Sequence, residues 1–106
     1  MSAPMNINEK NMASIMLMQA LLGVISPNFR MVAISFFGIE WKVGFWLEKE
    51  DEIDREEIED AIGEFDGLVL GMEGPPSKIN VVTEICEGSL PRLDVSDWRI
   101  IFLRRE

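Results

Sequence analysis

Residues 46–66 read Trp46-Leu-Glu-Lys-Glu-Asp-Glu-Ile-Asp-Arg-Glu-Glu-Ile-Glu-Asp-Ala-Ile-Gly-Glu-Phe-Asp66, and the fold depends on a change of pattern inside this stretch. Up to Leu47 apolar residues alternate with others, which is the period of a strand with one buried face. Further on, apolar residues recur at helical spacing and form one stripe. The stripe consists of Ile58, Ala61, Ile62 and Phe65. The stretch therefore predicts a strand followed directly by an amphipathic helix.

The predicted helix has sequence signals at both ends. Asp54 is a preferred N-cap residue, and Glu57 stands at the third helical position, as in a capping box. Ile53 before the cap and Ile58 after it would form a hydrophobic staple. Gly67 is expected to end the helix.

Two strands are predicted before this helix. The first covers residues 29–37 and the second residues 40–48, and a reversal at Gly38-Ile39 is expected to join them into an antiparallel hairpin. One face of the second strand is strongly apolar and is expected to point into the core. Its residues are Trp41, Val43, Phe45 and Leu47.

Helical spacing also predicts a first helix over residues 9–22, capped by Asn8. Two further strands are predicted at residues 79–86 and 98–104. The order helix-strand-strand-helix-strand-strand predicts an α+β fold with a mostly antiparallel four-stranded sheet and two helices on one face. It repeats as two helix–hairpin halves, and residues 1–106 are expected to form a single domain.

The net charge of the chain is concentrated in the same acidic stretch. Residues 48–66 contain 11 acidic and two basic residues, so their net charge of −9 equals that of the whole chain. Concentrated charge of one sign attracts a partner of the opposite sign. The sequence therefore favours a basic partner. The candidate partner-binding residues are Trp46, Glu48, Glu50, Asp51, Glu52, Glu56, Glu59, Asp60 and Glu64.

Some of these assignments have a plainer alternative. The acids also fit a solvated face, although Glu64 lies near the C-terminal end of the helix, where the helix dipole disfavours an anion. Trp46 lies on the strand face opposite Trp41. It is therefore either an exposed interface anchor beside the acids or a residue buried under a loop or the first helix.

The composition argues against catalysis, cofactors and metals. The chain contains no His and no Tyr, and its single cysteine, Cys86, has no His to activate it. Phosphate-binding glycine motifs are absent, and residues 48–54 have neither the ligand order nor the glycine of an EF-hand. The chain is therefore expected not to be an enzyme, and neither a cofactor nor a metal site is predicted.

The charge and hydropathy also limit where the protein acts. A pI near 4.4 argues against direct binding to nucleic acid or to an anionic membrane. The most apolar run, residues 12–25, is too short and too mixed to span a bilayer, and the first residues lack the basic region of a signal peptide. A cytoplasmic protein is expected.

Four segments of the chain carry a resemblance to a known group of proteins. They are residues 20–30, 54–57, 90–93 and 98–106. The chain resembles small bacterial proteins encoded beside polymorphic toxins, in particular immunity proteins of contact-dependent growth inhibition systems. The resemblance implies a cytoplasmic protein that binds and neutralises the C-terminal toxin domain of its own system, often a cationic nuclease. It transfers no binding residues.

An immunity protein whose acidic segment meets a basic toxin surface is therefore the leading hypothesis. One alternative is a regulatory or nucleic-acid-mimic protein whose acids occupy a nucleic-acid-binding protein. Another is a structural subunit in which the Met-rich first helix forms a homodimer and the acids only keep the protein soluble.

Overall fold

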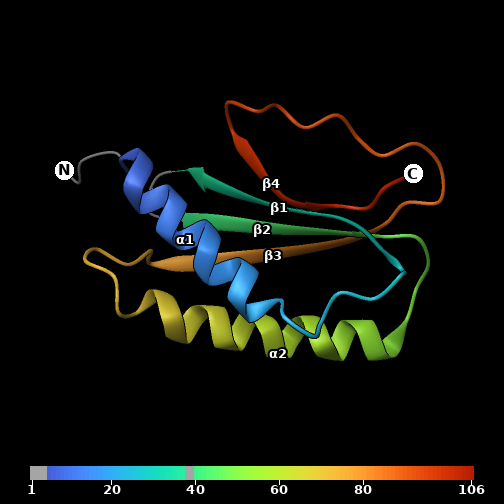
Figure 1. Cartoon of the computed structure of the whole chain (residues 1–106), viewed down its shortest axis with the longest axis horizontal. Coiled ribbons are helices and arrows are strands. Elements are labelled where there is room, and N and C mark those ends of the chain that lie inside the picture. The colour runs from blue at the N-terminus through green and yellow to red at the C-terminus, as the bar shows by residue number, and fades with distance from the viewer. Residues whose placement is uncertain (1–4, 38–39) are drawn as a thin grey trace.

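The computed structural model describes residues 5–37 and 40–106, and its elements follow the predicted order (Figure 1). The predicted reversal at Gly38-Ile39 lies outside the described residues. The fold class is α+β, with two helices and a four-stranded sheet. The elements are α1 (Ile7–Ala20), β1 (Phe29–Phe37), β2 (Glu40–Leu47), α2 (Glu52–Val69), β3 (Lys78–Ile85) and β4 (Trp98–Leu103).

The sheet is mixed, and this corrects part of the prediction. Its strand order is β3-β2-β1-β4; β1 pairs antiparallel with β2 and with β4, whereas β2 and β3 are parallel. The predicted second helix–hairpin half is wrong, because β3 and β4 lie at opposite edges. A parallel pair needs a crossover connection, and α2 supplies it between β2 and β3. Alternation within one strand does not reveal the direction of its neighbour.

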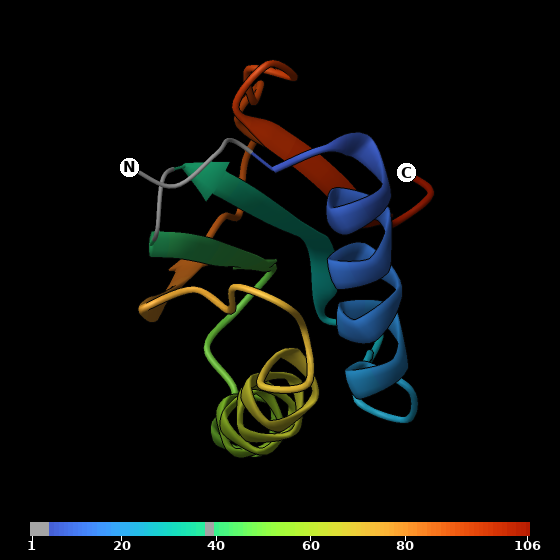
Figure 2. The ribbon, with the colours of Figure 1, turned by 90° about the vertical axis from the view of Figure 1, so that its left-hand side faces the viewer.

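Both helices lie on the same side of the sheet and pack against each other (Figure 2). The core beneath them is aromatic. Trp41 lies tilted against Phe65, with ring centroids 6.2 Å apart, and edge-on to Phe36 at 5.0 Å. Phe29 and Phe45 form another edge-on pair at 6.2 Å. The apolar face predicted for the second strand is buried here, which confirms its orientation.

Helix α2 begins earlier than predicted. Its N-cap is Asp51, whose side chain accepts a 3.0 Å hydrogen bond from the backbone N–H of Asp54. The predicted cap at Asp54 is therefore wrong, and so is the staple, because Ile53 is 69% exposed. Asp54 lies buried in the first turn and accepts a 2.9 Å hydrogen bond from Asn28 Nδ2. Both aspartates are residue types that suit an N-cap. The Asp54 side chain instead bonds to Asn28, which is far away in sequence, and Asp51 caps the helix.

The other helix ends also shift. The side chain of Asn6 caps α1 by accepting a 2.8 Å hydrogen bond from the backbone N–H of Glu9, so the predicted cap at Asn8 is wrong. Gly67 does not end α2. The helix continues to Val69, whose side chain is buried in the core. Packing of that last turn outweighs the low helix propensity of glycine.

Candidate partner-binding site

A groove with a volume of about 720 Å³ runs between α2 and the edge strand β3. Part of its lining is apolar, with Ile58 and Ile62 from α2 and Val81 from β3. Val81 is 41% exposed, so α2 leaves this part of the sheet open to solvent. Three of the candidate acids line the helix side of the groove, and we call them the groove acids. They are Glu52, Glu56 and Glu59.

The register of the sheet decides which β3 side chains face this groove. Val81 pairs with Val43, and Thr83 pairs with Phe45. Residues that are paired in neighbouring strands point to the same face of a sheet. Because Val43 and Phe45 are buried beneath the helices, Val81 and Thr83 also point to the helix side.

Two of the candidate acids are paired within the chain. Glu50 forms a salt bridge with Arg55, whose Nη2 donates to Glu50 Oε2 at 2.8 Å, and this hydrogen bonding lowers the pKa of Glu50. Glu48 accepts a 3.1 Å hydrogen bond from Arg104 Nη2. Arg55 also lines the groove, but its partner Glu50 offsets its charge there.

The remaining candidate acids divide by position. Asp51 is half-buried as the N-cap of α2. The groove acids are exposed, and none of the salt bridges among the described residues involves them. Asp60 and Glu64 are exposed on α2 but do not line the groove. The groove therefore gathers acids whose charge is not compensated by an ion pair in the described part of the chain.

Trp46 is only 5% exposed, so its interpretation as an exposed anchor is wrong and burial under a loop is the correct alternative. It forms a cluster with Met31 and Ala33, against which residues of the connection 86–97 and Trp98 pack. The Trp46 and Trp98 rings meet edge-on at 5.9 Å. A Cβ atom at Gly44 would collide with the Trp46 ring. This face of the sheet therefore has a small apolar layer of its own.

Arg30, which is not among the predicted site residues, holds the covering connection in place. It is 7% exposed and lies where the register of β1 against β2 shifts. Its Nη1 donates to the backbone oxygen of Cys86 at 2.7 Å and also to that of Gly88. Its Nε and Nη2 donate to the Glu106 carboxylate at 2.8 and 2.7 Å, and this bonding lowers the pKa of Glu106 to about 2. The sequence did carry a signal, because Arg30 is the single charged residue in a mostly apolar strand.

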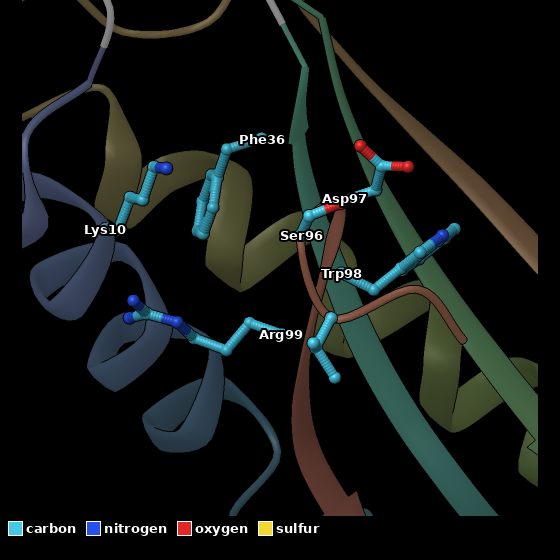
Figure 3. A pocket seen from close by; sticks show the side chains of 7 residues that line it. Lys10, Phe36, Ser96, Asp97, Trp98 and Arg99 are labelled. Atoms are coloured by element: carbon cyan, nitrogen blue, oxygen red, sulfur yellow. The ribbon is translucent and has the colours of Figure 1, made fainter. Parts of the chain in front are cut away.

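A smaller hollow of about 250 Å³ lies where β4 begins, beside α1 (Figure 3). Lys10 reaches it from α1, and Arg99 reaches it from β4. Arg99 Nη1 donates to Asn11 Oδ1 at 2.8 Å and to Ser14 Oγ at 3.1 Å, which ties β4 to α1. None of the candidate partner-binding residues lines this hollow, so it is separate from the groove.

Within residues 5–37 and 40–106, no group of three or more His, Cys, Asp or Glu side chains is arranged to hold a metal ion. In the same ranges, neither helix combines the length and the hydropathy that crossing a bilayer requires.

Comparison with known proteins assigns the chain to the polymorphic-toxin immunity proteins. The family model described as MafI2 immunity protein matches residues 10–106, which is nearly the whole chain, and the chain belongs to this family. No curated protein matches the chain. Family membership assigns an immunity function against a toxin and makes the cognate toxin the binding partner. Such families generally act without catalysis.

Proposed function

We propose that the protein neutralises its cognate toxin by laying the groove beside α2 over a cationic surface of the toxin domain. The supporting observation is that the three groove acids, which form no salt bridge with any described residue, border an apolar lining. A nuclease binds phosphates with basic side chains and therefore presents a cationic surface that would complement the groove acids. For this reason we take the toxin domain to be a nuclease. The groove acids would then occupy the places of phosphates, in the cytoplasm where the nucleic acid lies.

Charge and apolar contact would act at different stages of binding. Complementary charge raises association rate constants from about 10⁵–10⁶ to about 10⁸ per molar per second or more at low salt. Fast capture matters because unbound toxin damages the cell. Once water leaves the groove, contacts with Ile62 and Val81 would slow dissociation.

Replacing the groove acids by glutamine (Glu52→Gln, Glu56→Gln and Glu59→Gln together) is expected to slow association with the cognate toxin domain by about tenfold or more at low salt. The salt dependence of association should also become weaker, since fewer exposed charges remain to be screened. Stopped-flow binding at two salt concentrations measures both effects, and thermal denaturation checks that the variant is folded.

The matched control changes three exposed acids that do not line the groove to amides, at Asp66, Glu73 and Glu87. Both triple variants lose the same net charge. The proposal requires the control to associate much faster than the groove variant. Equal slowing would mean that only net charge matters, and a groove variant with the wild-type rate would refute the proposed site.

A second proposal concerns the outer face of α1, where Met12, Ile15 and Met18 are 54%, 62% and 47% exposed. Several large apolar side chains on one exposed helix favour an interface, here between two copies of the chain. Ile15→Glu is then expected to convert a dimer into a monomer, as measured by light scattering, with no loss of helicity by circular dichroism. A wild-type protein that is monomeric at every concentration would exclude this homodimer.

A further inference from the structure

Strand β3 presents a long and regular edge of the sheet. All eight of its residues, Lys78–Ile85, pair in register with β2 without a bulge, and β3 is the last strand in the order β3-β2-β1-β4. No further strand among the described residues pairs with its outer side. The opposite edge, β4, is shorter and has a register irregularity in its pairing with β1.

The middle of β3 lacks the features that usually protect an edge strand. Natural edges are blunted by charged side chains, proline or bulges, because unpaired N–H and C=O groups invite another strand. Residues 79–83 read Ile-Asn-Val-Val-Thr and contain neither a charge nor a proline. The strand therefore keeps a row of main-chain donors and acceptors that a partner can use.

The groove lies directly beside this edge. Figure 1 shows α2 running alongside β3, and the two elements line the groove together. A Cβ atom placed on Gly63 would meet no other atom within 4 Å, so the helix wall is open at that point. A strand added to β3 would direct every second side chain toward the helix side of the sheet, and thus toward α2.

The spacing of the acids along α2 suits such a strand. Glu52 and Glu56 are one helical turn apart, which is about 6 Å along the axis. Same-face residues of a strand are about 6.7 Å apart. Two basic side chains at alternate positions of an added strand would therefore each reach one acid, while apolar side chains further along the same face of that strand would meet Ile62 and Val81.

We infer that the edge of β3 binds an extended segment of the toxin domain, which adds a fifth strand to the sheet and places basic and apolar side chains of one face in the groove. This inference rests on the proposed function and deepens it. Main-chain hydrogen bonds to β3 would supply affinity, and the groove would supply specificity.

Hydrogen–deuterium exchange of the immunity protein, alone and bound to its cognate toxin domain, tests the inference directly. Backbone amides that point to the outer side of β3 have no strand partner among the described residues, and they should become protected in the complex at every second residue. Amides that already pair with β2 should change little. Binding that leaves every amide of Lys78–Ile85 unchanged would overturn the inference while leaving the proposed groove intact.

Proline substitution gives a second test. Neighbouring N–H groups of a strand point to opposite edges. Of the two variants Val81→Pro and Val82→Pro, one therefore removes an N–H that pairs with β2, and the other removes only an outward N–H. The second variant should keep the wild-type melting temperature. That variant is expected to dissociate from the toxin domain about two- to tenfold faster than its alanine control, the effect of one lost hydrogen bond. If it dissociates at the rate of the control, the edge is not used. If both proline variants unfold, the exchange experiment decides.

The two proposals can fail separately. If the glutamine triple variant associates as fast as the wild type, the groove acids are not the site of charge attraction. Protection of the β3 amides in that same variant would then still show strand addition. Slow association of the triple variant together with unprotected β3 amides would retain the groove and remove the added strand.

Discussion

Replacing Phe65 by alanine is expected to lower the free energy of unfolding by about 3–5 kcal/mol. The Phe65 side chain is fully buried where α2 meets the sheet, and its ring centroid lies 6.2 Å from that of Trp41. Truncation removes these contacts and leaves a cavity that the close-packed neighbours fill only in part. Urea denaturation followed by circular dichroism measures the loss.

Ile62→Ala provides the comparison within the same helix. Ile62 is half-buried and lines the groove, so part of its side chain already faces solvent. Ile62→Ala is expected to lower the free energy of unfolding clearly less than Phe65→Ala does, because less buried apolar surface is lost. Equal losses in the two variants would contradict the assignment of Phe65 to the core face and Ile62 to the groove.

Trp46→Ala is expected to lower the free energy of unfolding by about 3–5 kcal/mol. It removes the centre of the small apolar layer that Trp46 forms with Trp98 on the face of the sheet opposite the helices. Trp46→Phe should retain much of the stability. Phenylalanine keeps the ring contact, and it removes an indole N–H that finds no acceptor among the described residues. An unsatisfied buried donor of this kind costs about 1–3 kcal/mol.

Differential scanning calorimetry of both Trp46 variants separates the two effects. If Trp46→Ala melts like the wild type, the connection 86–97 does not form a packed cover. Toxin binding by the folded phenylalanine variant adds a check on function. A changed dissociation rate there would mean that the buried ring influences the partner surface after all.

Much of the fold could be predicted from the sequence, because local patterns carry the information. Strand β1 has the predicted bounds, and the buried face of β2 follows from its alternation. Helix caps were less predictable, since several residues of the right type stand close together, as Asp51 and Asp54 do. The parallel pairing of β2 with β3 was missed because no local feature of β3 records it.

The candidate site shows the same division. The concentration of acids was evident from composition, but their separation into groove acids and other acids depends on where α2 lies against β3. Pairing of Glu48 with Arg104 joins residues far apart in sequence, so counting nearby charges could not reveal it. Trp46 was ambiguous for a related reason, since the connection that covers it comes much later in the chain, between β3 and β4.

Strand β1 has one neighbour that is close in sequence and another that is distant, which affects the order in which the protein can fold. The hairpin with β2 is local, whereas the ladder with β4, in which Ile34 pairs with Arg99, closes most of the chain into a loop. Such non-local pairing is slow to form. Because synthesis proceeds from the N-terminus, the edge of β1 that pairs with β4 stays unpaired until β4 has left the ribosome. The four-stranded sheet can therefore be completed only after β4 has been made.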